Sequence, residues 1–258
     1  MTAYIGTNGN DTLVGLDDVS DDFTGKLGND VLIGGDGFGQ DWAHYDDAPS
    51  AVTVNLAAGT ATGGDGNDTL SGIERVTGSK FNDTLRSGFS SGFGVLYGAA
   101  GNDTLIGDDG FDSLKGGAGN DTLKLVGSGL DLNLADFHET LDGLETFDMT
   151  NNGNNTLMLT LADLLNLSDT THTFTIDGDE GDRVVGLMEG WAVGGIEGNY
   201  RIFTNGETMV RVDTAVITDD RIEVINLTEL NGSNGFSTDG ARSFVSVSNA
   251  GDVNGDGF

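Results

Sequence analysis

Three consecutive nonapeptides between Gly98 and Lys124 constrain the fold of this chain more than any other feature. They read GAAGNDTLI, GDDGFDSLK and GGAGNDTLK, and no residue separates one from the next. Each has Gly at its first and fourth positions, Asp at its sixth and Leu at its eighth. A short fixed period predicts one small structural unit that is stacked on itself.

The unit divides into a turn and a short strand. Its first six residues are rich in Gly, Asn and Asp, which accept positive φ angles and turn a chain sharply. The remaining residues form a minimal strand with one inward-pointing leucine, and such a strand needs parallel neighbours to satisfy its backbone groups. We therefore expect Leu105, Leu114 and Leu123 to form an apolar ladder.

The acidic residues of the turns need a partner of opposite charge. Asp103, Asp112 and Asp121 would lie in stacked turns at short spacing, where like charges repel unless a cation lies between them. Carboxylates and backbone carbonyls are hard oxygen ligands, which favour calcium over zinc or copper. The pattern therefore predicts calcium in the turns.

These units resemble the glycine- and aspartate-rich nonapeptides of the RTX (repeats-in-toxin) or hemolysin-type calcium-binding proteins. The resemblance implies an all-β fold, a parallel β-roll with two nonapeptides per coil and alternate turns on opposite edges. It also implies that Asp103 and Asp121 share a calcium ion on one edge, with help from nearby carbonyls, while Asp112 faces the other edge.

Further units extend the repeat towards the N-terminus. Clear units occupy 6–14, 25–33, 63–71 and 78–86, and degenerate units begin at about residues 16 and 34. The alternation pairs Asp11 with Asp30 on one edge and Asp21 with Asp41 on the other. In the unit 89–97, Gly94 stands where Asp belongs, so we expect a weak or empty site opposite Asp112.

The resemblance assigns metal-binding roles to side chains and backbone groups of all these turns. The acidic candidates are Asp11, Asp30, Asp36, Asp41, Asp65, Asp68, Asp83, Asp103, Asp109, Asp112 and Asp121. The remaining candidates come from the glycine- and asparagine-rich positions, namely Gly9, Gly28, Gly98, Gly101, Gly116, Gly119, Asn102 and Asn120.

Composition excludes several classes of partner. The chain has 42 acidic and 11 basic residues among 258 and a formal charge of −31, which disfavours nucleic acids and anionic membranes. It has no cysteine, no apolar stretch long enough to span a bilayer and no N-terminal secretory signal. The resemblance instead implies type I export. Because the sequence stops within a motif, we expect it to be part of a longer chain.

We expect three segments. Residues 1–126 form the roll, with a strand insert near 45–62 where apolar residues alternate with small polar ones. Residues 127–230 form a β-rich capping module that resembles modules of bacterial adhesins and contains a hairpin turning at Asn205-Gly206. Residues 231–258 form a linker followed by the start of an FG-GAP-like repeat.

Other motifs favour structural roles. His138-Glu139 begins like a zinc-protease helix, but Asp142 stands where the second histidine is required, so a catalytic zinc site is not expected. The acidic loop 177–182 is interpreted as a turn rather than a metal site, and replacing Asp182 should then change folding little. Trp42 and Trp191 could stack on sugars, although packing in the core or in turns is favoured.

The leading hypothesis is a non-catalytic, calcium-folded structural module of a secreted or cell-surface bacterial RTX protein of the adhesin type. One alternative is the accessory region of an extracellular protease, lipase or polysaccharide-modifying enzyme. Another is a surface-layer or glycan-binding module with a glycan or protein ligand at the cell surface. Several calcium ions are expected in each case.

Overall fold

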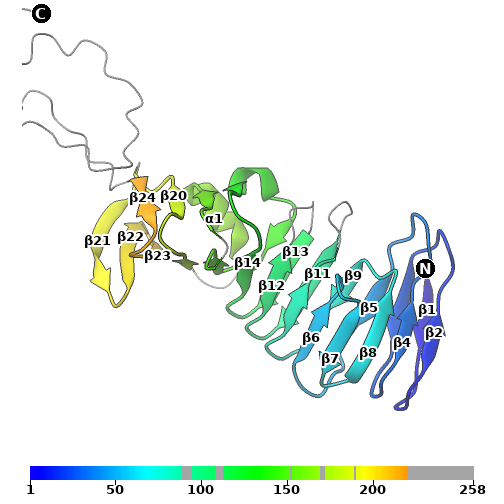
Figure 1. The fold of residues 1–258 in the computed structure, drawn as a ribbon. Helices are drawn as coiled ribbons and strands as arrows, with labels where there is room; N and C mark the ends of the chain where they lie inside the picture. The colour runs from blue at the N-terminus through cyan, green and yellow to red at the C-terminus, as the bar shows by residue number, and fades with distance from the viewer. Residues whose placement is uncertain (89–93, 108–112, 152, 169–171, 189, 220–258) are drawn as a thin grey trace, which may run out of the picture. The chain divides into compact units, whose positions relative to one another are not determined.

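The computed structural model describes residues 1–88, 94–107, 113–151, 153–168, 172–188 and 190–219 (Figure 1). Residues Met1–Asp220 form one compact unit. The second unit, Arg221–Phe258, lies outside the described residues, and with it the FG-GAP-like segment. Two candidate metal ligands, Asp109 and Asp112, also lie outside them.

Two sheets form the walls of the roll, and the repeat strands alternate between them. The first sheet has seven parallel strands, in the order β1 (Thr2–Ile5), β3 (Asp21–Thr24), β5 (Trp42–His44), β9 (Arg75–Thr77), β11 (Val95–Ala100), β13 (Ser113–Ala118) and β16 (Leu141–Asp142). Figure 1 shows these strands stacked in chain order from the N-terminal end.

The second sheet has thirteen strands and runs further. Its first half follows the order β2 (Thr12–Val14), β4 (Val31–Ile33), β8 (Gly66–Ser71), β7 (Thr60–Gly63), β6 (Val52–Asn55) and β10 (Thr84–Arg86). Its second half continues with β12 (Thr104–Gly107), β14 (Thr122–Leu125), β17 (Thr146–Asp148), β19 (Thr173–Asp177), β23 (Thr208–Asp213), β22 (Tyr200–Asn205) and β21 (Ala192–Glu197).

A third, four-stranded parallel sheet begins after Lys124. It contains β15 (Asp131–Asn133), β18 (Thr156–Met158), β20 (Arg183–Val185) and β24 (Ile217–Thr218). Two short helices lie between its strands in the chain, the 3-10 helix η1 (Leu134–Phe137) and α1 (Leu161–Leu167). Thr160 and Asp163 form a reciprocal capping box at the start of α1, which supports so short a helix.

The core consists of apolar ladders, one on the inner face of each sheet. Leu105 and Leu123 are in register on β12 and β14, whereas Leu114 lies on β13 in the opposite sheet, in register with Leu96. All are at most 3% exposed. The predicted parallel β-roll with two nonapeptides per coil is therefore confirmed, and the single predicted ladder is two ladders that belong to opposite sheets.

The insert predicted near 45–62 is a pair of extra strands within one wall. Strands β6, β7 and β8 pair in antiparallel fashion inside the second sheet, while β5 pairs directly with β9 in the first sheet. The repeat 63–71 therefore supplies the last strand of this meander, and β8 then pairs with β4 in the usual parallel register.

The strands continue past the point where the nonapeptide period ends. Strand β14 pairs with β17, β17 with β19 and β19 with β23, all in parallel, so the sheet crosses the boundary expected at 126/127 without a break. Strands β22 and β23 then form the expected antiparallel hairpin, with Gly206 at a φ of 62° in its turn.

The stacked leucines should carry much of the stability of so thin a core. Replacing Leu105, which is fully buried, with alanine should reduce the free energy of unfolding by about 2–5 kcal/mol, because the substitution leaves a cavity. Chemical denaturation in saturating calcium measures this effect. The matched control is Leu16→Ala, since Leu16 is 56% exposed, and an equal loss in both variants would contradict the ladder as the core.

Candidate calcium sites

One buried carboxylate per coil links each turn to the turn before it. The backbone N–H of Asp11 donates to Oδ1 of Asp30, that of Asp83 to Oδ1 of Asp103, and that of Asp103 to Oδ1 of Asp121, at 2.7–2.8 Å. On the other edge, the N–H of Asp21 donates to Oδ1 of Asp41 at 2.8 Å. The expected pairings along each edge are therefore present in the structure.

Three rungs of this ladder were missed from the sequence. Glu74 and Glu145 accept the N–H groups of Asp41 and Asp121 at 2.8 and 2.9 Å, and Asn155 accepts that of Leu130 at 3.0 Å. The two glutamates belong to the triplets Gly-Ile-Glu and Gly-Leu-Glu, in which the glycine has a φ near 60°. A shorter turn with a longer acidic side chain thus reaches the same backbone group.

The second carboxylate oxygen provides the test of whether a cation fits. Asp30 and Asp103 are each 1% exposed, and their Oδ2 atoms are buried without a hydrogen-bond partner. An orphaned buried carboxylate oxygen is costly and calls for a positive ligand. A calcium ion binds carboxylate oxygens at about 2.3–2.6 Å, so a buried carboxylate oxygen without a hydrogen-bond donor is a suitable ligand for it.

The glycine at the first position of the unit allows the backbone to approach this oxygen closely. A Cβ atom on Gly98 would overlap Oδ2 of Asp103 and the carbonyl oxygen of Gly116, the equivalent glycine of the next coil. A Cβ on Gly116 would in turn overlap Oδ2 of Asp121. Carboxylate and carbonyl oxygens therefore lie close together beside these glycines, and hard oxygen donors of this kind suit calcium.

Burial makes these carboxylates weak acids while no metal is bound. Desolvation raises the pKa of Asp103 to about 7, and the charges of Asp121 and Asp83 add to the rise, against the opposing hydrogen bond from Asp83. The pKa of Asp30 and that of Asp41 are raised as well, chiefly by burial. A bound cation would favour the ionised carboxylates and reverse this tendency.

The asparagines and fourth-position glycines of the unit have stacking roles. The N–H of Asn120 donates to Oδ1 of Asn102 at 3.0 Å on the exposed tip of the turn. Gly28, Gly101 and Gly119 have positive φ angles, and a Cβ on any of them would overlap the backbone of a neighbouring coil. Metal ligation by their backbone or by these amides, and by Gly9, remains a proposal.

The third-position aspartates differ from one another. Asp36 is exposed, and its N–H donates to Oδ1 of Asp17. Asp65 is 6% exposed, and burial together with Asp68 and Asp30 raises its pKa to about 6. Oδ2 of Asp68 accepts the hydroxyl of Tyr45 at 3.1 Å, so a phenol partly satisfies this carboxylate.

The acidic loop 177–182 contains a structural rung. Asp182 is fully buried, with Oδ1 accepting the N–H of Asn155 and Oδ2 that of Asp179, both at 2.8 Å. A turn was expected here and is found. However, Asp182 is a buried carboxylate that accepts two backbone N–H groups. The small effect on folding that was expected for its replacement does not agree with this role.

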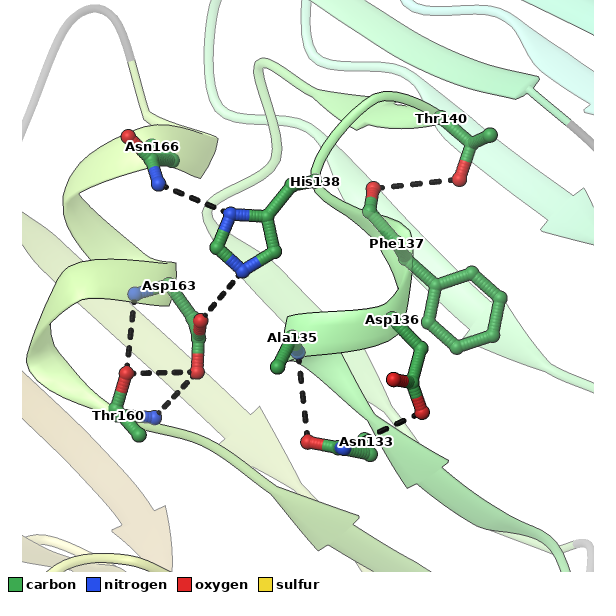
Figure 2. A network of polar contacts seen from close by, with 9 residues as sticks. All are labelled: Asn133, Ala135, Asp136, Phe137, His138, Thr140, Thr160, Asp163 and Asn166. Carbon is green, nitrogen blue, oxygen red and sulfur yellow. Dashed lines mark hydrogen bonds and ion pairs between the residues drawn. The ribbon is translucent and has the colours of Figure 1, made fainter.

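The histidine singled out by the zinc comparison joins the two helices. Nε2 of His138 lies 2.8 Å from Oδ1 of Asp163, and Nδ1 lies 3.1 Å from Nδ2 of Asn166 (Figure 2). Oδ2 of the same aspartate accepts the N–H and hydroxyl of Thr160. These contacts fasten η1 to α1, in agreement with a structural role.

The tryptophans differ in position. Trp191 is 8% exposed and belongs to the core. Trp42 instead lies on the outer side of β5, where Ala43 points inward, and it stacks on His44 with Arg75 5.5 Å from its ring.

In the described part of the chain, no group of three or more histidine, cysteine or acidic side chains could hold a metal ion by itself. Calcium in the turns would therefore need further oxygen ligands, and backbone carbonyls are among the ligands that this ion accepts. No helix among the described residues is long and apolar enough to cross a membrane.

Comparison with known proteins identifies the repeat. The family model of the RTX calcium-binding nonapeptide repeat matches four copies, within residues 17–37, 58–72 and 96–124. The comparison with curated proteins gives no match. Among solved structures, the crystal structure of extracellular lipase LipA from Serratia marcescens matches 85% of this chain and 38% of its own, at 17% identity and a TM-score of 0.22.

The overall superposition with the lipase is too weak to carry an argument, and this chain spans well under half of its length. The assignment of calcium to this chain rests on the matched repeats, because RTX nonapeptide repeats bind several calcium ions. The sequence pattern, the stacked carboxylates and the family match agree: this chain contains RTX calcium-binding nonapeptide repeats, which fold as a parallel β-roll.

Proposed function

We propose that this chain is a non-catalytic module that calcium folds, within a secreted or cell-surface protein of the adhesin type. The single observation that supports it best is the buried carboxylate ladder, in which Oδ2 of Asp30 and of Asp103 lacks a hydrogen-bond partner. In a chain with a formal charge of −31, stacking such carboxylates without cations costs free energy through the repulsion of like charges.

Calcium binding and folding would be one process. The ligands of each site come from turns that stand in register only when the strands are paired, as the Asp83–Asp103 and Asp103–Asp121 contacts illustrate. A site that is absent from the unfolded chain contributes its binding free energy to folding. The module would therefore be unfolded at low calcium and folded at high calcium.

This coupling suits export. Extracellular calcium modules bind calcium weakly, with a Kd of about 10⁻⁴ to 10⁻³ M. Intracellular calcium sensors bind it more tightly, with a Kd of about 10⁻⁷ to 10⁻⁵ M. The chain would thus remain unfolded inside the cell, where a type I exporter accepts it, and would fold outside. The adhesin assignment rests on the sequence resemblance of residues 243–258 to the opening of an FG-GAP repeat.

The accessory region of an extracellular enzyme is the alternative, because fold alone does not define function. The described contacts of His138 are with Asp163 and Asn166, so they place no nucleophile beside it. The sequence that adjoins this segment in its parent protein separates the two proposals, since a zinc-protease helix or a serine nucleophile motif there would favour the enzyme.

Calcium removal should unfold the module. In excess chelator the far-UV circular dichroism signal of β-structure should be lost, and calcium should restore it in a transition that coincides with heat release in calorimetry. Magnesium at equal concentration serves as the control, because it dehydrates reluctantly and demands octahedral geometry. A spectrum indifferent to chelator would remove the proposed coupling.

The response to pH should reverse with calcium. Without metal, the raised pKa values of Asp103 (about 7) and Asp65 (about 6) mean that these groups favour the folded state when protonated. That contribution is complete below their unfolded pKa near 4 and is lost as pH rises through about 6–7. Any residual structure in chelator should therefore melt at a higher temperature at pH 5 than at pH 8.

With calcium the order should be opposite, because calcium binds the ionised carboxylates and competes with protons. The melting temperature should then rise from pH 5 to pH 8, and calcium affinity should rise with it. Thermal melts at both pH values, with and without chelator, measure the crossover. The same pH order under both conditions would contradict the role given to the buried carboxylates.

A further inference from the structure

Eight of the rung aspartates fall into two classes according to the second residue of their turn, and Asp68, whose Oδ2 accepts the hydroxyl of Tyr45, belongs to neither. In the first class, the backbone N–H of that residue closes the turn by donating to the second carboxylate oxygen. Thr7 donates to Oδ2 of Asp11 through its N–H at 2.6 Å and its hydroxyl at 2.9 Å. Ser79 donates to Asp83 through the same two groups.

Two more turns belong to this closed class. The N–H of Leu16 donates to Oδ2 of Asp21 at 3.0 Å, and the N–H of Asp179 donates to Oδ2 of Asp182 at 2.8 Å. Neither of these second residues, nor Thr7 or Ser79, has a positive φ angle. In all four turns the backbone itself supplies the partial positive charge that the carboxylate needs.

In the second class the peptide before the second residue is turned over, and its N–H does not reach the carboxylate. The second residues are Lys26 at a φ of 68°, Gly35 at 125°, Ala99 at 78° and Gly117 at 98°. For Lys and Ala this left-handed conformation costs about 1–2 kcal/mol. The matching carboxylates are those of Asp30, Asp41, Asp103 and Asp121. Two of them, Asp30 and Asp103, are the buried groups with an orphaned Oδ2.

The class follows the position of the turn in its stack. Asp11 and Asp21 are the first carboxylates on their two edges, and the N–H that reaches Oδ1 of Asp21 comes from Thr2. Asp83 follows Val52, the first residue of β6, whose N–H donates to its Oδ1.

The residue stacked before Asp182 is Asn155, whose side chain is uncharged. Each closed turn therefore carries the first carboxylate of a stack, and the open turns come after one.

We infer that the first acidic turn of each stack is a calcium-free cap, and that the calcium sites begin at the second acidic turn. This inference rests on the proposed calcium-dependent folding and specifies which turns take part in it. A first carboxylate has no charged neighbour before it, so one or two backbone or hydroxyl donors satisfy it. The carboxylate of an open turn stacks on an earlier carboxylate without a donor from its own turn, and the added repulsion calls for a full cation.

The cap is the counterpart of the N-cap of a helix, where a side-chain oxygen accepts otherwise unpaired N–H groups. It gives the residue at the second position a defined meaning. Thr7 and Ser79 add a hydroxyl donor and so suit the closed turn, whereas Gly35 and Gly117 accept the reversed peptide without strain. The calcium sites assigned in this way are the turns of Asp30, Asp41, Asp103 and Asp121.

Paired substitutions in the full chain test the assignment. Asp30→Asn and Asp103→Asn remove the charge of two open turns but keep a side-chain oxygen for the rung. Each should bind one calcium ion fewer than the unmodified chain, or bind one ion at least tenfold more weakly, in calorimetry and native mass spectrometry. Asp11→Asn and Asp83→Asn make the same change in two closed turns and should leave the number of bound calcium ions unchanged.

A loss of one ion in Asp11→Asn or Asp83→Asn would overturn the inference, as would full binding in Asp30→Asn or Asp103→Asn. If a variant does not fold, crystals of the unmodified chain grown in calcium decide the matter through anomalous scattering. Peaks should lie at Oδ2 of Asp30 and Asp103 and not at Oδ2 of Asp11 and Asp83. Peaks at all four turns would refute the caps alone, whereas the absence of any calcium would refute the proposed function as well.

Discussion

The structure depends on a single repeated contact, the hydrogen bond from the backbone of one turn to a buried carboxylate of the next. Each coil offers an aspartate such as Asp103, whose Oδ1 fixes the register of the coil before it, at Asp83. The contact places one negative charge above another along each edge. The same contact therefore fixes the register of the coils and creates the repulsion between them. A cation between the carboxylates would relieve the repulsion and leave the register unchanged.

The thin core follows from this arrangement. Each strand contributes about one inward side chain, such as Leu85 or Leu96, so the apolar contribution per coil is small and a coil is unstable without neighbours. Stability has to come from stacking, and stacking from charge compensation at the edges. The thin core is thus the physical basis of the proposed coupling between calcium binding and folding.

The ladders also show how the roll ends. Glu145 accepts the backbone N–H of Asp121 from a short turn at the point where the nonapeptide period has ended, whereas Glu74 makes the same contact within the roll and is followed in its sheet by β11 and β13. Beyond Glu145, strand β17 prolongs the wall without the repeat sequence, and the antiparallel strands β21, β22 and β23 complete the sheet. The change from parallel to antiparallel pairing replaces carboxylate stacking with hairpin turns, which need no cation.

The sequence by itself determined the repeating unit, because Gly at the turn positions, Asp at the sixth and Leu at the eighth specify local geometry within nine residues. The resemblance of this unit to RTX repeats predicted the β-roll and the alternation of edges, and Asn205-Gly206 predicted the hairpin. Only the tertiary structure decided which carboxylates are closed by their own backbone, that Glu74, Glu145 and Asn155 are rungs, and that Trp42 faces outward. These properties depend on which coil stacks before a given turn. Inserted strands such as those of the β6–β8 meander change this stacking neighbour, and the sequence of the turn itself does not reveal it.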